Sequence, residues 1–187
     1  MYNPNNPLVI TDIETGGLEL HHPIIQIAAI AIYPETLEVK AEFNVKIKFD
    51  ENECDPEALK INHYKAEDWV DAIPLVDALK QLKAFYARFA NTRRKSKKGS
   101  FYYVAIAGGY NSRFDSDRLF HRAREHDIFL PVDPRFLDVM QLAMWNLSLE
   151  GYKLTDIAAH FQIPVDGAHD AFVDVKLTAA VMQKLRK

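Results

Sequence analysis

Cysteine is nearly absent from the sequence, because Cys54 is the only one among 187 residues. A single thiol excludes an internal disulfide and any zinc site built from several cysteines, and it agrees with a reducing compartment. Catalysis by a serine or cysteine nucleophile is not expected either, because Cys54 lies in a polar stretch and no Gly-x-Ser-x-Gly motif occurs.

Long hydrophobic runs and a strong excess of one charge are also missing. No stretch of about 20 apolar residues is present to span a bilayer. The amino terminus, Met-Tyr-Asn-Pro-Asn-Asn-Pro, has neither the basic nor the apolar region of a signal peptide. We therefore expect a cytoplasmic protein without a membrane partner. The net charge of −3 argues against coating nucleic acid by bulk electrostatics, but it leaves room for a local basic track.

Length and apolar content indicate one globular domain. At 187 residues and 48% hydrophobic content, the chain is long enough for one well-covered core and short for two. We therefore expect a single domain over residues 1–187.

The first part of the chain predicts three strands. Leu8–Leu18 begins with an apolar, β-branched run that Gly16-Gly17 ends, and Ile24–Tyr33 is almost continuously apolar. Val39–Ile47 alternates between apolar and polar residues, as in an edge strand paired antiparallel with the second. Because the second strand is apolar on both faces, we expect the sheet to be covered on both sides and the first strand to be central.

The rest of the chain predicts two more strands among helices. The strands are Phe101–Ala107, which is apolar throughout and therefore central, and a short one near Phe136–Leu137. Helical segments are expected at residues 74–91, 138–147 and 155–161, from residue 170 to the end, and in a segment that ends near residue 126. Strands first, followed by alternating strands and helices, give a mixed sheet covered by helices.

Two carboxylates stand at the carboxyl end of the first strand. Asp12 and Glu14 share one face because alternate side chains of a strand point the same way. They could simply face solvent at the rim of the sheet. Carboxylates beside a covered sheet are costly unless paired or bound to a metal, and the strand contains no Lys or Arg. A hard divalent cation is the natural partner, and it would need oxygen ligands from elsewhere in the chain.

Three further polar residues lie at the starts of helices. Asp115 falls in the first turn of the helix after the fourth strand, Asp174 lies in the first turns of the last helix, and His169 sits at that helix's entrance. Taken alone, the two aspartates are explained by capping and by the helix dipole, and the histidine by a surface position.

The only basic run of the chain is Arg93–Lys98. A solvated loop is one interpretation of this run. A flap that contacts the phosphates of a nucleic acid is the other.

In chain order, the motifs are Asp-x-Glu at Asp12–Glu14, Asn-x-x-Phe-Asp at Asn111–Asp115 and His-x4-Asp at His169–Asp174. On these element types they resemble the three motifs of the DEDDh-type 3′→5′ exonucleases, the family that includes the proofreading subunit of bacterial DNA polymerase III. The resemblance covers nearly the whole chain. It implies an α/β, ribonuclease-H-like fold whose five-stranded mixed sheet has its second strand antiparallel to the rest.

The resemblance implies catalytic roles for five residues. Asp12, Glu14, Asp115 and Asp174 would bind two divalent metal ions, Mg²⁺ or Mn²⁺, and His169 would be the general base. Two cations about 3.5 to 4 Å apart stabilise charge on both the attacking and the leaving oxygen of a phosphodiester. A neutral imidazole, with an unperturbed pKa of about 6.5, can accept a proton from water near physiological pH.

The resemblance also implies a site for the terminal nucleotide. Thr15, Gly16 and Leu18 occupy positions that hold it, with Leu18 as an apolar wedge against a base. Asn111 matches the asparagine of the second motif, and Phe114 is expected to pack at the floor of the site. The sequence departs from the frequent family residues at Gly16, Gln26, Asn62-His63 and Tyr110.

These departures touch the substrate pocket and not the metal ligands, so the reaction class is better defined than the substrate. The preferred hypothesis is a metal-dependent exonuclease that acts at the 3′ end of single-stranded DNA and releases nucleoside monophosphates. One alternative is the same chemistry on RNA or short oligoribonucleotides. The alternative from another class is a catalytically inactive nucleic-acid-binding module. A polymerase or other replication partner is not identified by the sequence.

Overall fold

The computed structural model describes residues 7–33 and 35–186. Its main sheet has five strands in the order β3-β2-β1-β6-β7, so β1 is central as predicted. β2 is antiparallel to both β1 and β3, whereas β6 is parallel to β1 and β7 is parallel to β6. The predicted mixed sheet with an antiparallel second strand is therefore confirmed. The strands are β1 (Leu8–Thr15), β2 (Ile24–Ile32), β3 (Val39–Lys46), β6 (Ile106–Gly109) and β7 (Leu137–Asp138).

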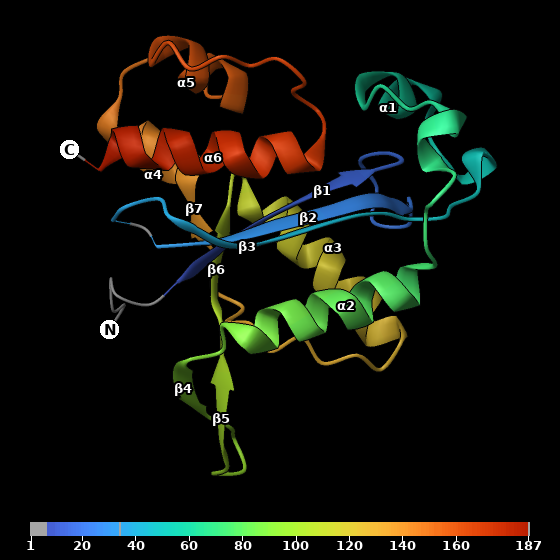
Figure 1. Cartoon of the computed structure of the whole chain (residues 1–187), viewed down its shortest axis with the longest axis vertical. Helices are drawn as coiled ribbons and strands as arrows, with labels where there is room; N and C mark the ends of the chain where they lie inside the picture. Colours follow the sequence, from blue (N-terminus) through green and yellow to red (C-terminus); the bar gives the residue numbers. More distant parts are fainter. Residues whose placement is uncertain (1–6, 34, 187) are drawn as a thin grey trace.

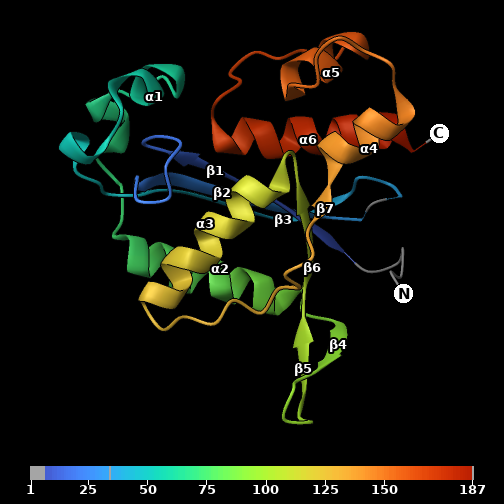
Figure 2. The same cartoon turned by 180° about the vertical axis from the view of Figure 1, so that it is seen from behind.

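Helices cover both faces of this sheet. α4, α5 and α6 lie on one face, and α2 and α3 lie on the other (Figures 1 and 2). A short helix, α1, stands near the carboxyl end of β1 (Figure 1). The bounds are α1 (Pro56–Ile61), α2 (Leu75–Arg88), α3 (Ser112–Glu125), α4 (Val139–Asn146), α5 (Leu154–His160) and α6 (Ala171–Leu185), with single 3-10 turns at Glu51–Glu53 and Ala66–Trp69. None of the described helices combines the length and the apolar character that a bilayer crossing requires.

The alternation of β1 decides which layer each of its side chains enters. Leu8 and Ile10 are buried in the core beneath α6, whereas Val9 and Ile13 are buried in the core with α2 and α3. Asp12 continues the face of Leu8 and Ile10 because strand side chains repeat every second residue. The carboxylates of β1 are thus presented on the α6 side, at the point where the apolar core ends.

The prediction of one central strand at Phe101–Ala107 was wrong in part. The segment divides into β5 (Phe101–Val104), which lies outside the main sheet, and β6, which pairs with β1. At the junction, Ala105 forms backbone hydrogen bonds with Pro131 and Asp133 instead of with either strand's partner. These bonds redirect the chain between two sheets, a change that apolar composition does not reveal.

The interpretation of the basic run as a solvated loop was wrong for Arg93–Lys95, whereas Lys97 and Lys98 lie in an exposed turn. β4 (Thr92–Lys95) pairs antiparallel with β5 in a two-stranded hairpin. β4 is polar and lacks the usual pattern of a strand, but β5 supplies its backbone partners and aromatic neighbours, and cross-strand pairs of this kind stabilise a ladder. The strand is therefore defined by its partner and not by its own residues.

Candidate active site

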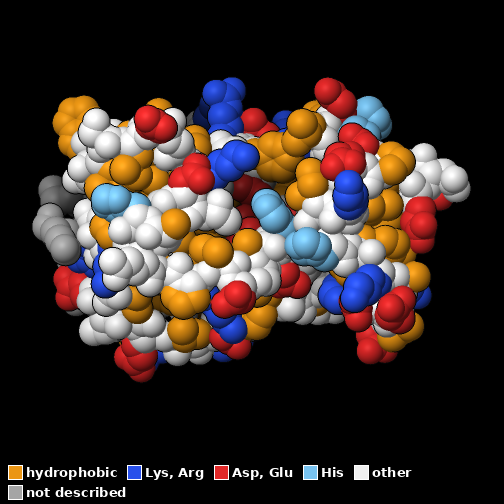
Figure 3. Space-filling view, turned by 90° about the horizontal axis from the view of Figure 1, so that it is seen from above, with side chains coloured by type: hydrophobic (Ala, Val, Ile, Leu, Met, Phe, Trp, Pro, Cys, Tyr) orange, Lys and Arg blue, Asp and Glu red, His pale blue; other side chains and the backbone are white. Residues whose placement is uncertain are grey.

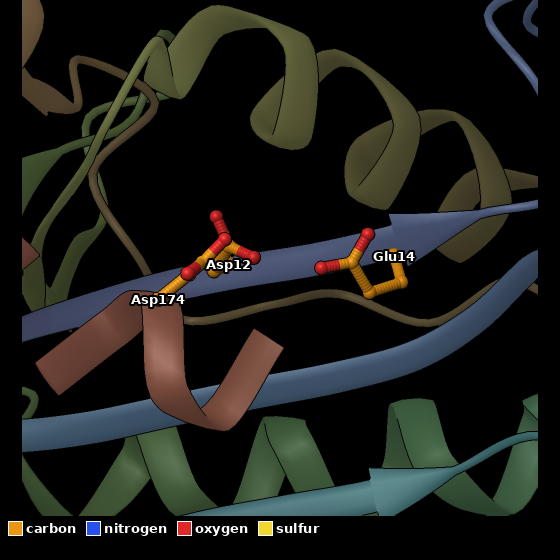
Figure 4. Close-up of side chains that lie close together, drawn as sticks. All are labelled: Asp12, Glu14 and Asp174. Atoms are coloured by element: carbon orange, nitrogen blue, oxygen red, sulfur yellow. The ribbon is translucent and has the colours of Figure 1, made fainter. Parts of the chain in front are cut away.

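Three carboxylates from distant parts of the chain converge above the sheet. Asp12 and Glu14 project from β1 and Asp174 projects from the first turns of α6 (Figure 4). One oxygen atom of each lies within 4.8 Å of the others. Oδ1 of Asp174 is buried, and it has no hydrogen-bond partner among the described residues. A buried acceptor without a donor is costly, so a bound cation would satisfy it.

The amino end of α6 is fixed to the sheet by a side-chain network that sequence patterns do not indicate. Gln26, buried on β2, donates from Nε2 to Oδ2 of Asp170 at 3.2 Å, and its Oε1 accepts from the backbone N–H of Ala171 at 3.3 Å. Asp170 itself caps the helix by accepting from the N–H groups of Phe172 and Val173. Since Asp174 lies one turn farther along, this network sets its position relative to β1.

Asp115 lies beside these three carboxylates, Asp12, Glu14 and Asp174, which we call the triad. Its position is fixed by a contact of its own. It is buried in the first turn of α3, and its Oδ1 accepts a hydrogen bond from the backbone N–H of Ile13 at 3.2 Å. The negative charge of Asp115 is nevertheless the strongest neighbouring charge that raises the pKa of Asp12. The four predicted carboxylates are therefore electrostatically coupled, although only three of them form the compact group.

Burial and mutual repulsion raise the pKa of each carboxyl group. Burial raises the pKa of Asp12 well above its usual range, with further contributions from Asp115, Glu14 and Asp174. Burial, then Asp174 and Asp115, raise the pKa of Glu14 to about 8. Burial raises the pKa of Asp115 to about 7, against the hydrogen bond from Ile13. Concentrated negative charge of this kind suits a divalent cation, so the residues fit a metal site.

The raised pKa values predict how the metal-free protein responds to pH. Carboxyl groups in an unfolded chain have pKa values of about 4, so between about pH 4.5 and pH 8 the folded state binds more protons than the unfolded state. Its free energy of unfolding must then fall as pH rises through this range. Each pKa unit corresponds to about 1.4 kcal/mol, so we expect the melting temperature in chelator to be at least about 3 °C lower at pH 8.5 than at pH 6.

Melting curves in chelator at the two pH values measure this difference, and Asp12→Asn/Glu14→Gln is the matched variant. We expect the variant to lose most of the pH dependence, because two of the coupled carboxyl groups no longer titrate. A wild-type melting temperature that is equal or higher at pH 8.5 would contradict the electrostatic description of the site.

His169 lies immediately before α6 and is exposed. Its backbone adopts the left-handed conformation, with a φ of 67°. Its backbone N–H donates to Oδ2 of Asp174 at 3.4 Å. The left-handed turn thus places His169 next to a carboxylate of the triad while leaving it open to solvent, and its role as a base stays a prediction.

A cavity of about 320 Å³ adjoins the carboxylates. Glu14, Thr15, Leu18 and Phe114 line it together with Asp55, Asn62 and residues of α1. Seen from above, the molecule has a hollow with acidic side chains at its floor and histidine and basic side chains at its rim (Figure 3). Two residues predicted to hold the nucleotide, Gly16 and Asn111, are not among the lining residues of this cavity.

Gly16 acts instead at the back of the cavity wall. A Cβ atom at this position would lie 2.4 Å from Sγ of Cys54, so only glycine allows this packing. The carbonyl of Gly16 accepts from the N–H of Asp55 at 2.7 Å, and Asn62 donates from Nδ2 to the carbonyl of Thr15 at 2.9 Å. These bonds attach both ends of α1 to the end of β1 and so build one wall.

Arg118 is a site residue that the motifs do not indicate. It is buried on α3, donates to the carbonyl of Leu18 and stacks its guanidinium 3.4 Å from the ring centroid of Phe114. The side chain of Leu18 is 80% exposed, and the bond from Arg118 holds its backbone together with the bonds that Arg122 donates to the carbonyls of His21 and His22. The sequence gives only a weak indication of this role, because Phe114 and Arg118 are four residues apart and therefore share a face of the helix.

Comparison with known protein families finds a match for the first part of the chain. Residues 9–96 match the family model RNase_T, described as Exonuclease. This segment contains Asp12 and Glu14 but not Asp115, His169 or Asp174. No curated protein sequence matches the chain.

Solved structures with the same fold are similar over nearly the whole chain. The nuclease domain of 3′hExo, a DEDDh family member bound to rAMP, has a TM-score of 0.73 at 16% identity, covering 96% of this chain and 91% of that chain. Exonuclease X in complex with 5′ overhanging duplex DNA has a TM-score of 0.64 at 20% identity, covering 95% and 90%. E. coli Exonuclease I in complex with a dT13 oligonucleotide has a TM-score of 0.71 at 19% identity, covering 97% and 41%.

These structural similarities confirm the predicted ribonuclease-H-like fold. The residues that match the exonuclease family model include most of the carboxylate-bearing strand β1. Together, the structural similarities and the family match confirm that the chain resembles the DEDDh-type 3′→5′ exonucleases.

Proposed function

We propose that this protein is a metal-dependent 3′→5′ exonuclease that removes nucleoside monophosphates from the 3′ end of single-stranded DNA. The observation that carries the proposal is the convergence of Asp12, Glu14 and Asp174 within 4.8 Å, beside a cavity that suits one nucleotide end. Neither Asp12 nor Glu14 has an ion-pair partner among the described residues, so their charge is available to cations.

Different residues of the site are proposed to bind the metal ions, to accept a proton and to contact the terminal nucleotide. Asp12, Glu14 and Asp174, with Asp115 beside them, would hold two divalent cations, Mg²⁺ or Mn²⁺. Such ions, when bound, make water a stronger acid and offset charge on the phosphate oxygens. His169 is the proposed general base that accepts the proton of the attacking water. Leu18 and Phe114 line the space proposed for the terminal nucleobase.

RNA is the second candidate substrate. The observation in its favour is the similarity over 96% of the chain to a nuclease domain bound to rAMP. A 2′-hydroxyl is distinguished by one or two contacts only, so the same carboxylates serve either substrate.

Matched DNA and RNA oligonucleotides with a 5′ label test the proposal. With Mg²⁺ or Mn²⁺, we expect a ladder of products that shortens from the 3′ end, faster for DNA, and we expect a circular single strand to stay intact. A faster ladder on RNA would select the second candidate. Cleavage of the circle, or no cleavage of either strand with either metal, would overturn the proposed function.

A further inference from the structure

The hairpin β4–β5 projects from the body of the protein, away from the sheet and its helices (Figures 1 and 2). We call residues Thr92–Val104 the arm. The arm contains five basic residues and no acidic residue, in a chain whose net charge is −3. The basic residues are Arg93, Arg94, Lys95, Lys97 and Lys98.

One face of the arm is attached to the body. Arg94 pairs across the hairpin with Tyr102, so the two share a face. Arg94 donates from Nε to Oδ2 of Asp133 at 2.7 Å, and Asp133 is only 2% exposed. The ring of Tyr102 meets that of Phe129 edge-on, with 6.2 Å between centroids. These contacts explain why this face of the arm points inward.

The opposite face is open and alternates cations with aromatic rings. The pairs Arg93 with Tyr103 and Lys95 with Phe101 lie on it. Phe101 and Tyr103 are each 56% exposed, and the guanidinium of Arg93 lies 3.6 Å from the ring centroid of Phe101. Exposed aromatic rings beside cations are the elements that bind single strands, because bases stack on rings while cations neutralise phosphates.

The arm and the carboxylates lie at opposite ends of the sheet. β6, which follows the arm, begins opposite Leu8 at the amino end of β1, whereas Glu14 lies near the carboxyl end. Six residues of strand span about 20 Å, so a dinucleotide at the carboxylates would not reach the arm. A strand whose 3′ end lies at the carboxylates could reach it only with a segment nearer its 5′ end.

We propose that the outer face of the arm, formed by Arg93, Lys95, Phe101 and Tyr103, binds the 5′-ward part of a single-stranded nucleic acid. The inference rests on the proposed function for the position of the 3′ end. The arm would increase the affinity for strands long enough to span the molecule.

Fluorescence anisotropy in chelator, with a labelled single strand of about 30 nucleotides, measures binding without cleavage. This length exceeds the roughly 4 to 16 nucleotides that one binding groove covers. We expect Phe101→Ser/Tyr103→Ser to raise Kd at least about 5-fold, the lower limit for one stacked base. Arg93→Ser/Lys95→Ser should reduce the slope of log K against log salt by up to about 1.4, because each phosphate contact contributes about 0.7.

The charge-matched control is Lys80→Ser/Lys83→Ser, which removes two exposed cations from α2. Lys97→Ser/Lys98→Ser, in the turn of the arm, is a second test that leaves the paired residues intact. The inference predicts a reduced salt slope for Arg93→Ser/Lys95→Ser, a smaller reduction for Lys97→Ser/Lys98→Ser because these lysines lie beyond the binding face, and little change for the control. Arm variants that bind like the control would overturn it.

Two further outcomes separate this inference from its alternatives. If sedimentation shows that arm variants break a dimer while Kd is unchanged, the arm binds a second copy of the chain and the inference is wrong. If the wild type binds the strand through the arm but fails to shorten it with metal, the proposed function fails and the arm inference stands. If it shortens the strand with no contribution from the arm, the arm inference alone fails.

Discussion

Asp12→Asn is expected to abolish most of the metal-induced rise in melting temperature and to reduce activity to background, while the metal-free variant stays at least as stable as the wild type. An ion bound only by the folded state stabilises it by about 2.7 kcal/mol at one hundred times Kd. For a chain of this length that is roughly 5 to 10 °C. Asp12 is also buried and repelled by four carboxylates, Asp115, Glu14, Asp174 and Asp170, so removing its charge relieves this repulsion in the absence of metal.

Melting curves with chelator and with Mn²⁺ measure both effects. Asp117→Asn is the matched control, because Asp117 lies two residues from Asp115 on α3 but points to solvent and pairs with Arg113. It removes the same charge, and we expect it to keep the full metal shift. An equal shift in Asp12→Asn would exclude Asp12 as a ligand. A large loss of stability in its metal-free form would favour a structural role.

The carboxylates could be proposed as a group from sequence because the order of the three motifs resembles that of a known family, although Asp115 and Asp174 taken alone are explained by capping. The two-residue period of a strand puts the side chains of Asp12 and Glu14 on one face whatever surrounds them. The predicted helix starts put Asp115 and Asp174 in the first turns of their helices. Which face of the sheet the side chains of Asp12 and Glu14 enter, and how near α3 and α6 approach them, depends on packing between segments that are distant in sequence.

The parts of the site that were missed all depend on such distant contacts. The bond between Gln26 and Asp170 joins residues 144 apart, and the bond from Arg118 to Leu18 joins residues 100 apart. The wall that α1 adds to the cavity depends on hydrogen bonds from the Asn62 side chain and the Asp55 backbone to the carbonyls of Thr15 and Gly16. None of these partners has a pattern of its own, so only the folded arrangement identifies them.

The arm shows the same limit at the level of secondary structure. The basic residues of β4 are poor strand formers, and Phe101–Val104 by itself has the composition of a core strand. Pairing puts them together outside the sheet, where Phe101 and Tyr103 are exposed instead of buried. An apolar run therefore indicated a strand correctly, but it did not indicate which sheet the strand joins.

Replacing His169 is expected to lower kcat by roughly 10²- to 10⁴-fold, the usual contribution of a positioned base, with the metal-induced melting shift close to that of the wild type. The structure gives a reason for this separation. The contact of His169 with Asp174 runs through its backbone N–H, which every substitution except proline retains. The acidic limb of the pH profile, which reports protonation of an essential base, should also disappear.

The left-handed backbone at His169 decides which variants test its role as a base. At a φ of 67°, alanine introduces strain, whereas asparagine tolerates this conformation and offers no basic group near neutral pH. His169→Asn should therefore lose kcat as fully as His169→Ala while retaining the wild-type melting temperature. His160→Ala, at the end of α5, is the matched control and should keep both. A wild-type kcat in His169→Asn would exclude the imidazole as the base, because the reaction would then proceed at full rate without it.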